Sequence, residues 1–154
     1  MNLAARAVLF LLMLGATGLT SAFGQQYDFA ASVSDNTLYF KITDNTNHYV
    51  QVVSPESYSW GSETQPTGSI DLPATISDGT TTYSVTSIGN AAFYNCTSLT
   101  SITFPGGMTG IGEDAFSNTG LTSLEVNVPT VGPYAFYGCT SLASMTIGAD
   151  VTSI

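Results

Sequence analysis

Apolar and polar positions recur in the same order three times along the second half of the chain. Each copy has an aliphatic residue followed by glycine, then an Ala-Phe pair, then three apolar positions in the rhythm L-x-x-L-x-L. The pairs are Ala92-Phe93, Ala115-Phe116 and Ala135-Phe136, so the period is about 20 to 23 residues. Self-similarity at this period predicts a solenoid, because one such unit buries its apolar side chains only by stacking on its neighbours.

The L-x-x-L-x-L rhythm predicts one strand per coil, paired in parallel with its copies in the coils on either side. These apolar side chains are expected to face inward, and the phenylalanines of the Ala-Phe pairs are expected to stack in a column against the opposite wall. The segments that carry these pairs predict short helical or 3₁₀ turns. The inward strand positions are Leu99, Ile102, Phe104; Leu121, Leu124, Val126; and Leu142, Met145, Ile147.

An incomplete copy precedes the three others. "SIDLP" at residues 69–73 matches "SITFP" at residues 101–105, which places the start of the solenoid near Gly68. The following stretch, "TISDGTTTYSV", carries Asp78-Gly79 between threonine-rich flanks and predicts a β-hairpin with a two-residue turn. The first coil is therefore expected to contain an inserted hairpin.

Residues 25–67 lack the repeat. "YDFAASV", "LYFKI" and "HYVQVV" alternate apolar and polar residues and predict three strands, with "SDNT" and "TDNTN" as Asx-type turns. A solenoid needs its first coil covered, since an unpaired strand edge and bare apolar surface would otherwise meet water. The sequence therefore predicts a mainly β fold, with a small N-terminal β cap at 25–67 and a solenoid at 68–154.

The first 24 residues have the pattern of a secretory signal peptide. A short basic start is followed by the apolar run Ala7 to Leu14 and by the small residues Ala22 and Gly24. We expect cleavage after Gly24, export to the exterior or cell surface, and no membrane insertion afterwards, because the run is too short to span a bilayer. The alternative is a short buried core helix.

The segment "VTSIGNAAFYNCTSLTSITFP" and its two variants resemble the BspA-like leucine-rich repeat family of bacterial surface proteins, over residues 70–154. The resemblance implies a secreted or surface-exposed protein that binds host matrix proteins or neighbouring cells and has no enzymatic activity. The second copy departs from the pattern, with Asn118-Thr119-Gly120 where the others have a cysteine-containing segment. The sequence ends on "VTSI", the opening of another copy, so we expect a fragment whose last coil is uncapped.

The charge of the chain limits the kinds of molecule that it is expected to bind. The sequence has eleven acidic residues against two basic ones, and only Lys41 is basic beyond the expected cleavage point. Such a surface repels phosphate backbones, so nucleic-acid binding is not expected.

The outward strand positions are the candidate binding residues. They would form the exposed face of the parallel sheet, the usual binding surface of such arrays. The alternative is that serine and threonine merely suit exposed strands, because this face offers no Trp, Tyr or Arg anchor. A single site should then be weak and gain strength from multivalency. The candidates are Ser101, Ser123 and Ser144 in one row, and Thr103, Glu125 and Thr146 in the next.

No catalytic, metal or cofactor site is expected. Cys96 and Cys139 lie two coils apart, which corresponds to roughly 9–10 Å and is too far for a disulfide, so both are predicted to be free and buried. Glu113-Asp114 falls at a variable repeat position, and His48 stands alone, with no serine or cysteine motif near it.

Three functions remain open at this stage. The first is an adhesion module that holds an extracellular protein or glycan on its sheet face. The second is a structural spacer that displays a C-terminal domain. The third is a polysaccharide hydrolase with a cleft near Trp60 and Tyr58.

Overall fold

The structure, a computed structural model, describes residues 27–56, 59–61 and 63–154. The expected signal peptide at residues 1–24 lies outside the described residues. Within them the chain forms eleven strands and no helix, which confirms the mainly β repeat fold. The strands are β1 (Phe29–Val33), β2 (Asn36–Asp44), β3 (Tyr49–Val53), β4 (Gly68–Asp71), β5 (Thr75–Ser77), β6 (Thr82–Ile88), β7 (Leu99–Thr103), β8 (Gly110–Ile111), β9 (Ser123–Val126), β10 (Thr130–Val131) and β11 (Ser144–Ile147).

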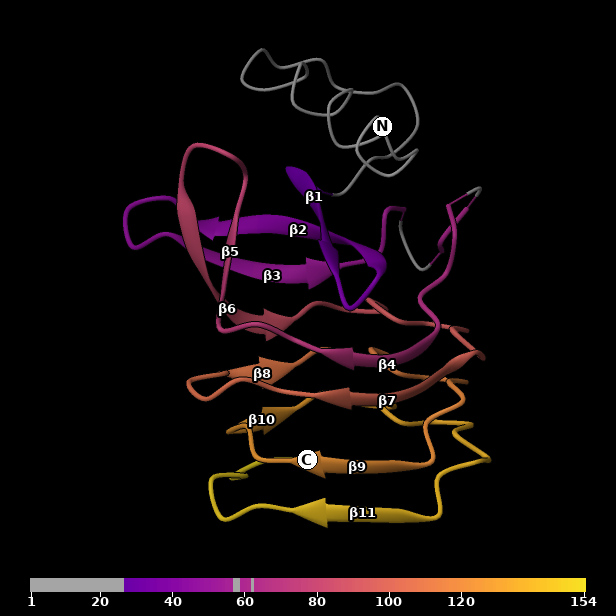
Figure 1. The fold of residues 1–154 in the computed structure, drawn as a ribbon. Coiled ribbons are helices and arrows are strands. Elements are labelled where there is room, and N and C mark those ends of the chain that lie inside the picture. The colour runs from indigo at the N-terminus through magenta and orange to yellow at the C-terminus, as the bar shows by residue number, and fades with distance from the viewer. Residues whose placement is uncertain (1–26, 57–58, 62) are drawn as a thin grey trace.

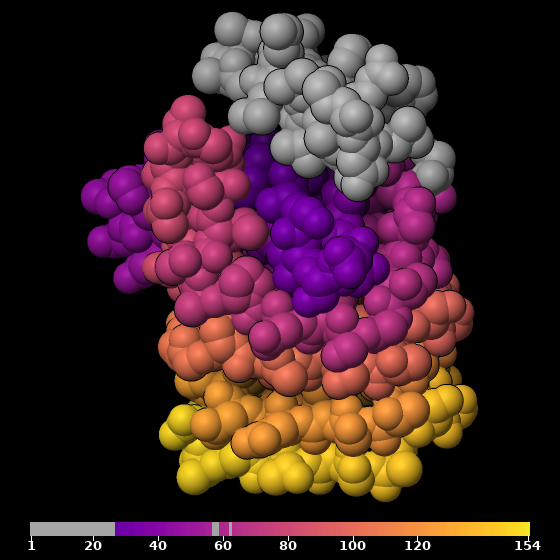
Figure 2. Space-filling view, in the orientation of Figure 1, coloured from indigo at the N-terminus to yellow at the C-terminus, as the bar shows by residue number. Residues whose placement is uncertain are grey.

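The coils stack one beneath another, with β4, β7, β9 and β11 on one side and β6, β8 and β10 on the other (Figure 1). In the space-filling view each coil forms a band across the molecule, from magenta to yellow (Figure 2). On the first side β4 pairs in parallel with β7, and β9 with β11. These are the strands that the L-x-x-L-x-L rhythm predicts, including the incomplete first copy.

The second side was missed by the sequence interpretation. The aliphatic residues of the Ile111-Gly112 and Val131-Gly132 steps end two-residue strands, β8 (Gly110–Ile111) and β10 (Thr130–Val131), and β6, β8 and β10 pair in parallel. The solenoid therefore has parallel strands on both sides: β6, β8 and β10 share one sheet, whereas β4–β7 and β9–β11 form two separate two-stranded sheets. Buried side chains from both sides belong to one hydrophobic core, but Met145 and Ile147 of β11, which the repeat predicts to face inward, are exposed.

The three expected N-terminal strands are present and continue this second sheet. β1 and β2 form a hairpin whose turn residues Ser34 and Asp35 both have positive φ, as a type I′ turn requires. β2 pairs antiparallel with β3, and β3 pairs in parallel with β6, which gives the order β1-β2-β3-β6-β8-β10. The N-terminal strands thus lie against the first coil and pair with its edge.

The hairpin inserted in the first coil is also present, as β5 and β6. Its register pairs Ser77 with Thr82, and the Asp78 N–H donates to the Thr81 carbonyl at 3.2 Å. The turn residues are therefore Gly79 and Thr80, one position later than the sequence predicts. Asp78 instead holds the turn, since its Oδ1 accepts N–H bonds from Thr80 and Thr81 at 2.8 and 2.7 Å.

The expected helical or 3₁₀ turns around the Ala-Phe pairs are not helices. Residues in the left-handed region interrupt each segment, at Ala91 and Asn95 in the first copy. Alternate N–H groups then point to the next coil: those of Ala91 and Phe93 donate to the carbonyls of Glu113 and Ala115, both at 2.8 Å. In a helix these N–H groups would donate to carbonyls of their own segment and could not bond to the next coil. Turns leave them free to pair between coils, so more of the backbone donors find a partner.

The predicted phenylalanine column is confirmed. Phe93 and Phe116 stack with ring centroids 5.1 Å apart and planes at 7°, and Phe116 and Phe136 are 5.8 Å apart at 11°. Trp60 lies beyond Phe93 at 6.5 Å and is only 2% exposed. Trp60 therefore does not line a cleft as the hydrolase alternative needs, because its ring is part of the core; Tyr58 lies outside the described residues.

Both cysteines are free thiols, but only Cys96 is buried as expected. Burial raises its pKa to about 12. Cys139 is half-exposed because it belongs to the last described coil. Thr119 takes the cysteine position in the coil between them, and its hydroxyl lies 3.2 Å from the Cys139 Sγ.

Candidate binding groove

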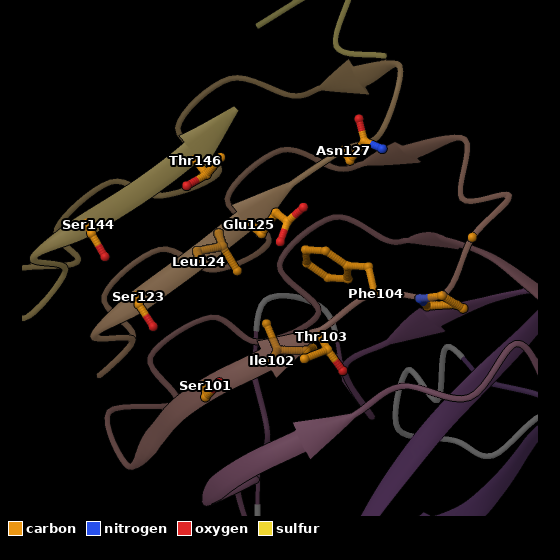
Figure 3. Close-up of a pocket in the computed structure, with 12 residues that line it drawn as sticks. Ser101, Ile102, Thr103, Phe104, Ser123, Leu124, Glu125, Asn127, Ser144 and Thr146 are labelled. Atoms are coloured by element: carbon orange, nitrogen blue, oxygen red, sulfur yellow. The ribbon is translucent and has the colours of Figure 1, made fainter. Parts of the chain in front are cut away.

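All six predicted binding residues line one groove on the outer face of β7, β9 and β11 (Figure 3). The groove has a volume of about 570 Å³. The register places Ser144 beside Ser123 and Thr146 beside Glu125, so the side chains form two rows that cross the strands. Their role in binding stays a prediction, whereas their convergence on one surface is observed.

The alternation along each strand explains this placement. In β9, Leu124 and Val126 are buried while Ser123 and Glu125 are exposed. Side chains alternate between the two faces of a strand, so burying the leucine frame forces the intervening residues outward. Because the coils repeat this frame, the outward positions stack at the strand spacing of about 4.8 Å.

The edge of the groove includes residues that the sequence did not indicate. Phe104, Pro105 and Asn127 also line it. Phe104 was expected to face inward, but it is half-buried: one part lines the groove, and its ring lies 5.9 Å from that of Phe116. Its counterpart Val126 is fully buried, so the bulk of the phenylalanine ring, at the end of the strand, is what reaches the surface.

Among the described residues that line the groove, Glu125 is the one with an ionisable side chain. On β4, outside the groove, the Asp71 carboxylate accepts a hydrogen bond from the Thr103 hydroxyl, across the paired positions of β4 and β7. The groove therefore offers hydroxyls, an amide, one carboxylate and a half-buried aromatic ring. These groups exchange hydrogen bonds and attract positive charge.

Elsewhere the residues weighed as chemistry-bearing have structural explanations. Asp44 forms the expected Asx turn: its Oδ1 accepts the N–H groups of Thr46 and Asn47 at 2.8 and 2.9 Å. These bonds, led by that from the Asn47 backbone, lower the pKa of Asp44. In the described part of the chain, no three His, Cys, Asp or Glu side chains gather as a metal site would need.

Among the residues that the structure describes, no helix has the length and apolar character needed to cross a bilayer.

Several solved structures resemble the chain at low identity. The pneumococcal vaccine antigen PcpA is 14% identical with a TM-score of 0.49, and the match covers 83% of this chain and 40% of that protein. A leucine-rich cell surface protein from Faecalibacterium prausnitzii is 19% identical with a TM-score of 0.40, over 82% of this chain and 45% of that one. A leucine-rich repeat protein from Bacteroides ovatus is 18% identical with a TM-score of 0.42, over 78% and 41%. The chain thus spans less than half the length of each of these proteins.

A search of curated proteins finds no match to the chain. The family model described as "BspA type Leucine rich repeat region (6 copies)" matches residues 73–154 of this chain. These residues include the strands of both sides of the solenoid from β5 onward, the Ala-Phe wall and the groove residues. Because this match spans more than half of the chain, the protein belongs to the BspA-type leucine-rich repeat family.

Proposed function

We propose that the protein is an exported adhesion module that holds an extracellular protein on the groove formed by β7, β9 and β11. Membership of a leucine-rich repeat family of this type indicates a role in protein–protein interaction, and such families are typically binding proteins rather than enzymes. The proposal that the partner is held in this groove rests on one observation, namely that all six outward residues line the same groove.

The chemistry of the groove supports a protein partner with donor groups and positive charge. Glu125 in the groove and Asp71, which is hydrogen-bonded to the groove residue Thr103, are both acidic and exposed, and no lysine or arginine is among the described residues that line the groove. Opposite charge across an interface raises the association rate and selects partners. The absence of a large aromatic or arginine anchor among the six residues favours weak single contacts, which several modules acting together would strengthen.

A bulky substitution in the groove is expected to weaken partner binding. Ser123 is exposed at the start of β9, so Ser123→Arg fills the groove and adds a charge that repels a cationic partner, without disturbing the core. We expect about a tenfold loss of affinity for whichever proteins of a purified extracellular-matrix panel bind the wild-type chain, measured by surface plasmon resonance.

The matched control is Glu113→Arg. Glu113 is exposed on the turn wall, outside the groove, and the substitution introduces the same side chain. Glu113→Arg should leave the affinity within about twofold of wild type when the variants are compared at an ionic strength that screens their difference in net charge. Equal losses in both variants, or no binding to any matrix protein, would argue against the groove as the adhesive surface.

Export is tested by the mass of the mature protein. The apolar run and the small residues at Ala22 and Gly24 predict cleavage after Gly24. When the full sequence is expressed in a bacterial host with a functional secretion system, the protein outside the cytoplasm should begin at Gln25 by intact-mass spectrometry. Replacing Leu11 and Leu12 with arginine interrupts the apolar run and should leave the uncleaved chain in the cytoplasm; cleaved, exported product from that variant would contradict the prediction.

A further inference from the structure

A second hollow lies where β6 changes its hydrogen-bonding partner. One edge of β6 pairs with β3. The other edge pairs first with β5, where Ser84 lies opposite Thr75, and then with β8, where Ser87 lies opposite Gly110. The sheet divides between these two partners, where the β5–β6 hairpin rises away from the coils (Figure 1). The hollow there has a volume of about 650 Å³, and the loop before β8 closes one side of it with Gly106, Gly107 and Thr109.

An irregularity in β6 turns extra hydroxyls toward this hollow. β3 pairs Val50 with Val85 but Gln51 with Ser87, so Thr86 is an additional residue in β6. Such a bulge breaks the alternation of faces, and Thr86 and Ser87 both line the hollow in succession. Thr86 is fixed by its hydroxyl, which donates to the Val50 carbonyl at 3.3 Å.

An aromatic ring stands at the edge of this hydroxyl-lined surface. The register places Tyr49 of β3 beside Ser84 of β6, and Ser84 beside Thr75 of β5, in one row across three strands. Tyr49 is 41% exposed and lines the hollow. Within the described residues, the hydroxyls of Thr75, Ser84 and Ser87 have no hydrogen-bond partner in the protein.

None of the described residues that line the hollow is charged. Three threonine hydroxyls donate to backbone carbonyls and keep oxygen lone pairs to accept from a ligand: Thr43 to Tyr49, Thr86 to Val50 and Thr109 to Thr86. A Cβ added at Gly106 or Gly107 would meet nothing within 4 Å, so the backbone there faces open space.

We propose that this hollow, which we name the sheet-fork site, binds a neutral saccharide. A sugar ring has an apolar face that packs on a tyrosine ring and hydroxyls that both donate and accept, which matches Tyr49 and the surrounding serines and threonines. The uncharged lining offers nothing to pair with an ionic ligand, and the volume lies in the range of small-molecule sites. The sheet-fork site differs from the adhesive groove in its strands and shares only Gly106 with it.

The test uses the wild-type chain and neutral disaccharides, namely maltose, cellobiose, lactose and chitobiose, in ligand-observed and protein-observed NMR. At least one is expected to bind saturably and to shift the amide resonances of Ser84, Ser87 and Thr109. Tyr49→Ala should weaken that binding about tenfold, and Tyr49→Phe, which keeps the ring, should change it by less than about threefold. Tyr134→Ala is the matched control, since Tyr134 is 66% exposed and lies away from the site.

The outcomes that overturn the proposal are separate from those for the groove. Absence of saturable binding by all four disaccharides overturns it, as does binding whose shifts map to the groove or which Tyr49→Ala leaves unchanged. Should Tyr49→Ala fail to fold, two other measurements test the proposal. The amide shifts of the wild-type chain must map to the sheet-fork site, and Thr75→Val must weaken saccharide binding. Ser123→Arg should leave saccharide binding intact, so failure of the adhesive groove does not affect this result.

Discussion

Replacing Phe116 with alanine is expected to destabilise the protein by about 3–5 kcal/mol. The side chain is fully buried, and its ring stacks between those of Phe93 and Phe136. The backbone around it is held on the far side by the Phe116 N–H, which donates to the Ala135 carbonyl at 2.8 Å. Because the coils are fixed by such bonds, the cavity left by the ring collapses only in part, and both the lost burial and the void add to the cost.

Phe136→Ala is the matched control for this prediction. Phe136 stacks on one ring only and is half-exposed, so its removal opens no closed cavity and should cost less than half as much. Both values come from denaturant unfolding followed by circular dichroism, with unchanged m-values as the check for a common unfolded state. Equal losses for the two variants would contradict a column whose centre lies at Phe116.

The strands of the groove side could be predicted because their signal is local. Leu124 and Val126 are buried and Ser123 and Glu125 exposed, as period-two alternation requires, and the same frame recurs in β7. The placement of the six groove residues follows from this alternation alone. Phe104 shows its limit, because the sequence cannot indicate that a ring at the end of β7 is shared between core and surface.

Neither the parallel pairing of β6, β8 and β10 on the second side nor the turns that carry the Ala-Phe pairs have a comparable local pattern in the sequence. β8 and β10 are two residues long, and their hydrogen bonds exist only once the coils have stacked. Ala91, Asp114 and Tyr134 have positive φ at equivalent positions, although alanine and tyrosine rarely adopt the left-handed region. In each case contacts between coils decide the local conformation, so no window of sequence contains the information.

The sheet-fork site illustrates the same limit. Its row of Tyr49, Ser84 and Thr75 comes from three strands separated along the chain, and β6 acquires its two partners on one edge only through the tertiary fold. The tyrosine and the hydroxyl residues were visible in the sequence, but their convergence was not.

Replacing Gly112 with alanine is expected to destabilise the protein by about 2–3 kcal/mol, although it adds a single methyl group. This glycine follows the aliphatic residue in every copy. An added Cβ would lie 2.6 Å from the Asn90 nitrogen and 2.7 Å from the Gly89 carbonyl carbon, both backbone atoms of the coil above. The Gly112 N–H also donates to the Ile88 carbonyl at 2.9 Å, so separating the coils to admit the methyl group weakens that bond.

The same crowding recurs one coil further on, and this explains why the aliphatic-Gly step is part of the repeat. A Cβ at Gly132 would lie 2.6 Å from the Glu113 nitrogen and 2.7 Å from the Gly112 carbonyl carbon. Gly106→Ala is the control, because a Cβ there meets nothing within 4 Å and its φ is not positive. It should leave the free energy of unfolding within about 0.5 kcal/mol of wild type, measured in the same denaturant titration. If Gly112→Ala is as stable as Gly106→Ala, the coils are not packed closely enough to exclude a methyl group at this position. The glycine of the repeat would then need another explanation.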